Sequence, residues 1–135
     1  MSSAKKRSDV IRLKRVYDPA TATDGRRFLV ERLWPRGVKK TQLKLDGWLK
    51  EAAPSTELRQ WFGHEPAKWT EFKRRYFAEL RLNPGAVEPV IDAVRSGSVT
   101  FLFSAHDVEH NNAVALKEYV EARLKRKPPS PKRAA

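Results

Sequence analysis

The chain of 135 residues contains no cysteine. This absence excludes disulfide bonds, thiolate catalysis and cysteine metal sites, and it fits a reducing compartment, so we expect a cytoplasmic protein. No stretch approaches the roughly 20 consecutive apolar residues that span a bilayer, and no membrane partner is expected. Neither usual form of glycine-rich phosphate loop is present, and the sequence has no HExxH motif. The sequence points to no cofactor and predicts no oligomeric state.

What the sequence does contain is an excess of basic residues, with a formal net charge of +12. Its length is that of one ordinary domain. We expect an α/β domain over residues 10–124, flanked by two disordered basic tails. The N-terminal tail, residues 1–9, has three basic residues and one acid. The Pro-containing C-terminal tail, residues 125–135, has no acid and these basic residues: Lys125, Arg126, Lys127, Lys132 and Arg133.

Basic tails attract any polyanion with an affinity that falls steeply with salt. One hypothesis is therefore a nonspecific nucleic-acid-binding or accessory module that uses the tails. The simpler alternative is that the tails only keep the protein in solution.

Hydrophobic periodicity predicts three strands separated by helices. The strands are expected at residues 10–17, 28–34 and 98–104. Helices are expected from Thr41 through Leu49, from Ser55 to Gly63, from Pro66 to about residue 82, over residues 87–96, and from Asn111 or Asn112 to Leu124. Strands joined by helical connections are typical of an α/β fold, here a single compact domain with a small, mostly parallel sheet and helices packed on it.

Polar side chains follow each predicted strand, where ligands bind in such sheets. We expect Arg15, Arg32 and Arg36 to hold a small anionic or nucleotide-like ligand, with Trp34 stacked on its organic part and Asn111 nearby. Three further residues could act as acid–base or orienting groups if the protein is an enzyme, which the sequence does not decide: His64, Asp107 and His110.

Each of these residues also has a simpler interpretation. Arg32 could form a structural ion pair with the adjacent Glu31, Trp34 could be a lid on the core, and Asn111 could be a plain helix N-cap. His106 and His110 have the i, i+4 spacing of a metal site, but they flank a loop that enters a helix, so no metal site is predicted. A third class of function, a partner surface made of exposed tryptophans, competes with burial of Trp61 and Trp69 in the core.

Two runs rich in rare residues identify a resemblance: Leu33-Trp34-Pro35-Arg36-Gly37 and Trp61-Phe62-Gly63-His64. Together with Arg15-Val16-Tyr17-Asp18, Ala53-Pro54-Ser55 and His110-Asn111, they resemble the YeaO-like family, within the domain of unknown function 488. The resemblance covers about residues 10–124. It implies a compact α/β domain and a shared polar site without a settled activity, formed by Arg15, Arg32, Trp34, Arg36, His64, Asp107, His110 and Asn111. The chain departs from the family pattern at Glu31, where Asp is usual, and at His106, where Lys is common.

Overall fold

The protein folds around a parallel sheet of four strands, as seen in a computed structural model that describes residues 11–125. The strands are β1 (Ile11–Arg15), β2 (Arg26–Leu29), β3 (Gly47–Trp48) and β4 (Val99–Phe103), in the spatial order β1-β4-β2-β3. Every pairing is parallel, so the predicted α/β class and sheet type are confirmed. Of the tails expected at residues 1–9 and 125–135, only Lys125 lies within the described residues, and it is the last residue of a helix rather than part of a disordered tail.

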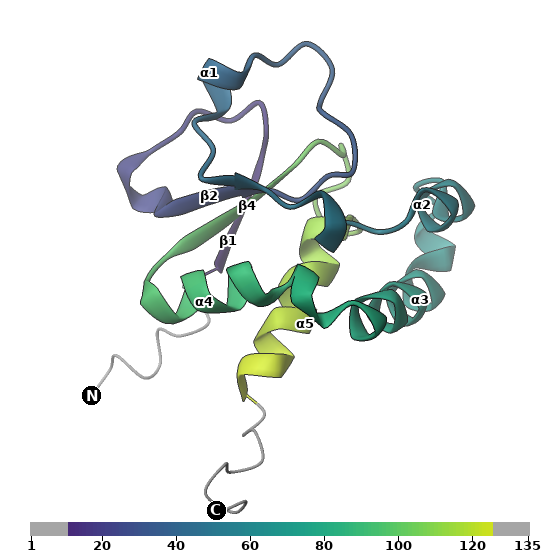
Figure 1. Ribbon diagram of the computed structural model, residues 1–135. Coiled ribbons are helices and arrows are strands. Elements are labelled where there is room, and N and C mark those ends of the chain that lie inside the picture. Colours follow the sequence, from purple (N-terminus) through teal and green to yellow (C-terminus); the bar gives the residue numbers. More distant parts are fainter. Residues whose placement is uncertain (1–10, 126–135) are drawn as a thin grey trace, which may run out of the picture.

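Five α-helices accompany the sheet: α1 (Lys40–Leu43), α2 (Thr56–Phe62), α3 (Trp69–Leu82), α4 (Glu88–Ser96) and α5 (Asn112–Lys125). No helix within residues 11–125 is long and apolar enough to cross a membrane. Figure 1 shows α4 and α5 below the sheet, with α2 and α3 extending to one side. The polypeptide between β3 and β4 contains α2, α3 and α4, as the helical periodicity of that region predicts.

The larger core lies between the sheet and these helices. In β4, the side chains of Val99, Phe101 and Phe103 join this core, because alternate residues of a strand point to the same face. Phe72 and Tyr76 of α3 pack into it from the helix side. β4 lies between β1 and β2 and is buried along its whole length. This explains why it is the most apolar segment of the sequence.

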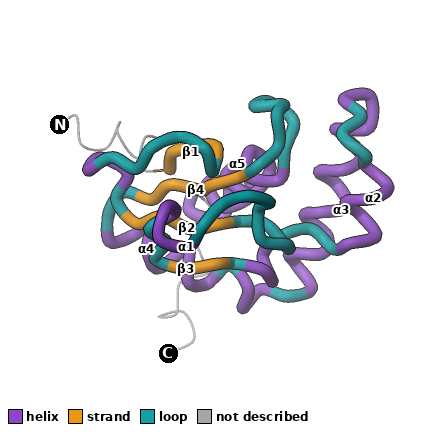
Figure 2. The backbone as a smooth tube through the Cα atoms, turned by 90° about the horizontal axis from the view of Figure 1, so that it is seen from above, coloured by secondary structure: helices purple, strands orange, loops and turns teal. Residues whose placement is uncertain are grey.

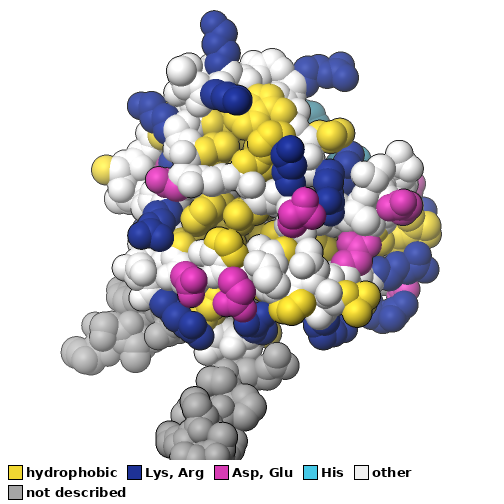
Figure 3. All heavy atoms as spheres, in the orientation of Figure 1, with side chains coloured by type: hydrophobic (Ala, Val, Ile, Leu, Met, Phe, Trp, Pro, Cys, Tyr) yellow, Lys and Arg dark blue, Asp and Glu magenta, His cyan; other side chains and the backbone are white. Residues whose placement is uncertain are grey.

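The segment of residues 34–50, which we call the cap, packs on the opposite face of the sheet and includes the edge strand β3. The small core on this face consists of Val16, Leu29, Leu102 and, from the cap itself, Leu43. Four half-buried side chains of the cap close this core: Trp34, Val38, Leu45 and Trp48. Figure 2 shows the short helix α1 and its flanking loops lying over the strands, and Figure 3 shows hydrophobic side chains gathered in this region.

The helix predicted from Thr41 through Leu49 is wrong beyond Leu43. Lys44 has a left-handed backbone conformation, with a φ of 49°, and ends α1. The chain then forms β3, where Gly47 and Trp48 pair with Phe28 and Leu29 of β2. A Cβ atom at Gly47 would lie 3.0 Å from the ring of Phe28, so the glycine that weakens the helical pattern lets two strands approach.

The second strand is shorter than predicted, because β2 ends at Leu29 rather than at Trp34. Val30 still donates its N–H to Leu102 of β4, but no further backbone bond continues the ladder in that direction. Beyond Val30, side chains make the contacts: Glu31 binds Ser104 after β4, and Arg32 binds the carbonyls of Ala53 and Pro54.

Helix α2 is fixed at both ends by the residues that the sequence predicts. Ser55 is the N-cap, and its Oγ accepts a hydrogen bond from the N–H of Leu58 at 3.1 Å. The same hydroxyl donates to Glu79 of α3, which ties the two helices together. Gly63 is the C-cap. Trp61 and Trp69 are half-buried against the larger core, as expected from their spacing.

Candidate functional site

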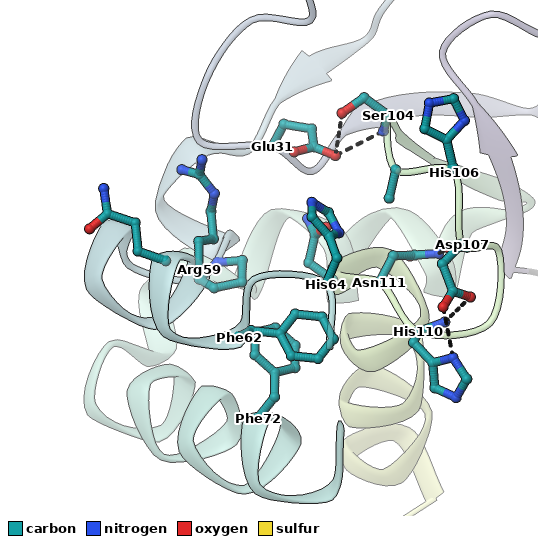
Figure 4. A pocket seen from close by; sticks show the side chains of 14 residues that line it. Glu31, Arg59, Phe62, His64, Phe72, Ser104, His106, Asp107, His110 and Asn111 are labelled. Carbon is teal, nitrogen blue, oxygen red and sulfur yellow. Dashed lines mark hydrogen bonds and ion pairs between the residues drawn. The ribbon is translucent and has the colours of Figure 1, made fainter. Parts of the chain in front are cut away.

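A cavity of about 550 Å³ opens where β2 and β4 end. Parallel pairing brings these carboxyl ends to one edge of the sheet, where α/β proteins commonly bind ligands. The polar part of the wall comes from three segments, namely the residues after β2, the C-terminal end of α2, and the loop from β4 to α5 (Figure 4). Its polar and charged side chains are Glu31, Arg59, Gln60, His64, Ser104, His106, Asp107, His110, Asn111 and Asn112.

Glu31 is held at one end of the cavity by the beginning of the β4–α5 loop. Its Oε2 accepts hydrogen bonds from the backbone N–H of Ser104 at 2.9 Å and from the Ser104 hydroxyl at 3.3 Å. Burial raises the pKa of Glu31, although these hydrogen bonds and the charges of Arg59 and His64 act in the opposite direction. The other carboxylate oxygen, Oε1, accepts no hydrogen bond from residues 11–125 and remains available to a ligand.

We expect Glu31→Gln to raise the free energy of unfolding at pH 7. The amide oxygen can keep the bonds from Ser104, while the cost of burying a charge disappears. Because the pKa of Glu31 is higher in the folded than in the unfolded protein, the parent loses stability as the pH rises above the ordinary value of 4.5. The difference in stability between Glu31→Gln and the parent therefore grows over the same pH range. Urea denaturation at pH 4 and pH 7 measures both effects.

The matched control is Glu109→Gln, because Glu109 is exposed near the same cavity and its substitution should change little. If Glu31→Gln were less stable than the parent at both pH values, the fold would require the carboxylate itself. In that case Glu31 could not be regarded as a group kept at a cost to stability.

Two basic residues of the cavity wall come from α2 and its C-terminal end: Arg59 within the helix and His64 two residues after it. The Nη1 nitrogen of Arg59 is buried, and no group within residues 11–125 accepts a hydrogen bond from it. His64 follows the C-cap of α2 and has a φ of 60°, a left-handed conformation that costs a histidine of order 1 kcal/mol or more. Both side chains point toward the end of the cavity where Glu31 and Ser104 lie (Figure 4).

The loop between β4 and α5 is built around Asp107. Its carboxylate accepts hydrogen bonds from the backbone N–H groups of Glu109 and His110, and Oδ2 lies 2.9 Å from Nδ1 of His110. The bonds from Glu109 and from the His110 ring hold the pKa of Asp107 below its usual range. An ionised Asp107 fixes the proton of His110 on Nδ1 and leaves Nε2 to interact with other groups.

Aromatic rings form the apolar wall of the cavity. Phe62 of α2 and Phe72 of α3 are stacked with ring centroids 4.4 Å apart. Trp69 extends this stack and meets the His110 ring edge to face at 5.3 Å. A ligand in this cavity therefore meets rings on one side and hydrogen-bonding groups on the other, as Figure 4 shows.

The structure places four of the eight predicted site residues in the cavity wall: His64, Asp107, His110 and Asn111. Asn111 also has a structural task. Its side-chain oxygen accepts a hydrogen bond from the N–H of Val114 at 3.0 Å, so the N-cap interpretation holds. Its amide group donates to the carbonyl of Asp107 at 2.8 Å and steadies the loop.

The other four predicted residues, Arg15, Arg32, Trp34 and Arg36, do not line the cavity. The Arg15 guanidinium donates to the carbonyls of Ser104 and Ala105 at 3.1 and 2.9 Å, and so holds the β4–α5 loop in place. Arg32 donates to the carbonyls of Ala53 and Pro54, and its ion-pair partner is Glu51 at 3.8 Å rather than Glu31. Both arginines therefore support the site's framework from outside.

Trp34 and Arg36 belong to the cap. Trp34 closes the small core and donates its Nε1–H to the carbonyl of Val38 at 2.7 Å, as the core-lid interpretation expects. Arg36 is exposed and has no ion pair with any acid of the described chain. The fold therefore does not bring Trp34 and Arg36 into a common anion site with Asp107 and His110.

Sequence reasoning missed Arg59, Phe62 and Phe72 as site residues. Arg59 and Phe62 are three residues apart, and such residues are neighbours on a helix surface. The resemblance of Trp61-Phe62-Gly63-His64 pointed to the correct helix end. Metal binding has no support within residues 11–125, where no three histidine or carboxylate side chains gather closely enough to hold an ion.

Comparison with known proteins identifies the family. Residues 10–134 match the model of the DUF488-N3i family, which is described as the inactive DUF488-N3 subclade. The uncharacterised protein YeaO of Escherichia coli K12 is 44% identical over 112 residues, which cover 83% of this chain and 97% of YeaO. The uncharacterised protein Rv3073c of Mycobacterium tuberculosis H37Rv is 34% identical over 84% of this chain and 95% of its own. No solved structure matches. The chain belongs to the YeaO-like DUF488 family.

Proposed function

We propose that this YeaO-like DUF488 protein binds a small, nucleotide-like organic anion in the cavity at the ends of β2 and β4. The observation that carries the proposal is Arg59, a residue of the cavity wall whose Nη1 is buried and has no hydrogen-bond acceptor among the described residues. An unpaired buried donor costs about 1–3 kcal/mol, more when it is charged. An anionic ligand group would remove that cost and would have His64 beside it.

The remaining groups of the wall specify more of the ligand. Oε1 of Glu31 offers an acceptor to an N–H or O–H donor, and the stacked rings of Phe62 and Phe72 offer an apolar surface. A molecule with an anionic group, a planar part and hydrogen-bond donors satisfies all three, as a nucleotide does. The cavity volume of about 550 Å³ lies in the range of small-molecule sites.

Binding without turnover is the form of the proposal that we favour. The matching family model carries the description "inactive", which supports a binding role over a catalytic one. We therefore assign orienting roles to the three residues considered for acid–base work. His64 would face the anionic group, while Asp107 would hold His110 so that Nε2 can accept a hydrogen bond.

The test is the thermal stability of the full chain with guanosine 5′-monophosphate, adenosine 5′-monophosphate, the free nucleosides and inorganic phosphate. We expect a nucleotide to raise the melting temperature, since a ligand at about 100 times its Kd stabilises the folded state by about 2.7 kcal/mol. Arg59→Met should weaken binding about 10- to 100-fold, because a hydrogen bond to a charged group is worth about 1.5–3 kcal/mol.

Arg95→Met is the matched control, since Arg95 is exposed on α4 and does not line the cavity. It should bind the nucleotide as the parent does. A parent protein whose melting temperature responds to none of these compounds would contradict the proposal. So would a shift that Arg59→Met leaves unchanged.

A further inference from the structure

The cap carries most of the positive charge of the folded domain. Residues 34–50 hold five basic side chains and one acid, and so contribute four of the six net positive charges of residues 11–125. The basic residues are Arg36, Lys39, Lys40, Lys44 and Lys50, and all five are exposed. None of them forms an ion pair with an acid inside the described part of the chain.

The single acid of the cap, Asp46, is tied to the sheet. Its Oδ2 accepts a hydrogen bond from the backbone N–H of Arg27 at 2.7 Å, and its own N–H donates to the Arg27 carbonyl. Asp46 therefore serves to hold the cap on β2. In the region of α1, Figure 3 shows a group of hydrophobic side chains with Lys and Arg side chains around it.

Two tryptophans lie among these cations. The rings of Trp34 and Trp48 meet edge to face with centroids 5.3 Å apart, and both are half-buried. Each Nε1–H donates to a backbone carbonyl, of Val38 and Glu31 respectively, which fixes the orientation of the ring. The Lys50 ammonium lies 4.3 Å from the centre of the Trp48 ring. The cap thus combines aromatic rings of fixed orientation with exposed positive charges.

We propose that the cap binds single-stranded nucleic acid. Lysine and arginine side chains that no acid neutralises attract the phosphate backbone, and aromatic rings within such a surface give unpaired bases a stacking partner. The proposal is independent of the cavity. It also differs from binding by the basic tails, because it places the contact on residues 34–50 of the folded domain.

Charge and exposure favour nucleic acid over a membrane surface. A peripheral membrane site inserts large apolar side chains between lipids. Here the Nε1–H groups of both tryptophans donate to backbone carbonyls of the protein itself. None of the large apolar residues that are exposed in the described chain lies within the cap; they are Tyr17, Leu33, Leu82 and Val108. The apolar side chains of the cap instead close the small core beneath it.

The number of cations predicts the salt dependence. Five phosphate contacts on a single strand give a slope of log K against log salt of about −3.5, because each contact contributes about −0.7. The experiment measures fluorescence anisotropy of a labelled oligouridylate against the full chain over a range of salt concentrations. The triple variant Lys39→Glu, Lys40→Glu and Lys44→Glu should bind at least about tenfold more weakly, with a slope lower by about 2.

The control changes the net charge equally at three exposed positions outside the cap, Arg12→Glu, Arg81→Glu and Arg95→Glu. It should keep the parent's slope and most of its affinity, and urea denaturation confirms that both variants fold. Equal losses in the two variants, or no binding by the parent, would overturn the proposal. Loss of binding on removal of residues 1–9 and 126–135, with the cap variant unaffected, would place the contact on the tails.

Two further binding measurements test other polyanions, a nucleic-acid duplex and an anionic membrane. A duplex of the same length that binds as tightly as the single strand would overturn the role of base stacking. Vesicles containing phosphatidylserine that bind the protein, when the oligouridylate does not, would overturn nucleic acid as the partner. Weak binding of both competitors is the result that we expect.

Discussion

Asp24→Asn is expected to destabilise the protein by about 3–5 kcal/mol, the range for breaking a buried ion pair by removing one partner. The Asp24 side chain is 2% exposed and accepts a hydrogen bond from Nη1 of Arg27 at 2.6 Å. It also binds the Lys14 ammonium at 2.9 Å. Asparagine keeps an acceptor oxygen but carries no negative charge, so the buried guanidinium of Arg27 would lose its counter-ion. Chemical denaturation at neutral pH measures the loss.

Two controls distinguish the loss of this buried ion pair from the loss of a carboxylate charge in general. Asp92→Asn removes an exposed carboxylate from α4 and should change stability by less than about 0.5 kcal/mol. The double variant Asp24→Asn with Arg27→Met should cost less than the sum of the two single changes, because no uncompensated charge is left in the interior. Simple additivity would show that the two side chains do not act as a pair.

Asp24 also predicts how the protein responds to acid. Burial alone would raise the pKa of this carboxyl, but hydrogen bonds from Lys14, Thr21 and Arg27 outweigh it and hold the pKa well below the ordinary 3.8. A group with a depressed folded pKa stabilises the protein above its unfolded pKa and loses that contribution as the pH falls toward the folded value. The stability difference between the parent and Asp24→Asn should therefore narrow below about pH 4.

The fold was predictable wherever a pattern extends over several residues. The alternation in β1, the continuous apolar run of β4 and the helical spacing of Phe72, Tyr76 and Leu80 all place the correct side chains in the core. The failures are short elements decided by contacts distant in sequence. β3 has two residues and exists because Gly47 and Trp48 meet β2. No local pattern can distinguish such a strand from a turn at the end of a helix.

The site was predictable in its location but only in part in its residues. Three groups of polar residues at strand ends pointed to the correct edge of the sheet, and the β4–α5 loop does carry cavity residues. Neighbours in an extended segment point in opposite directions, so either Glu31 or Arg32 could have faced the cavity. In the structure Glu31 lines the cavity and binds Ser104, while Arg32 binds the carbonyls of Ala53 and Pro54.

Gly25→Ala is expected to cost about 3 kcal/mol or more, the combined effect of a strained backbone and an overpacked contact. Gly25 follows Asp24 with a φ of 66° and precedes β2. A Cβ atom there would lie 2.2 Å from the carbonyl oxygen of Ser98, which accepts the N–H of Arg26 at the start of the β2–β4 pairing. Because the clash is with backbone, relief requires the first residues of β2 to move away from β4.

Gly37→Ala isolates the conformational part of this cost. Gly37 has a φ of 75°, similar to that of Gly25, but a Cβ atom there would meet nothing within 4 Å. We expect a loss of about 1 kcal/mol from the left-handed backbone alone. Urea denaturation of the two variants beside the parent gives the difference. If Gly37→Ala were as destabilising as Gly25→Ala, the backbone conformation and not the approach of Ser98 would explain the glycine at position 25. A difference of about 2 kcal/mol or more would instead make the close contact between β2 and the start of β4 the reason.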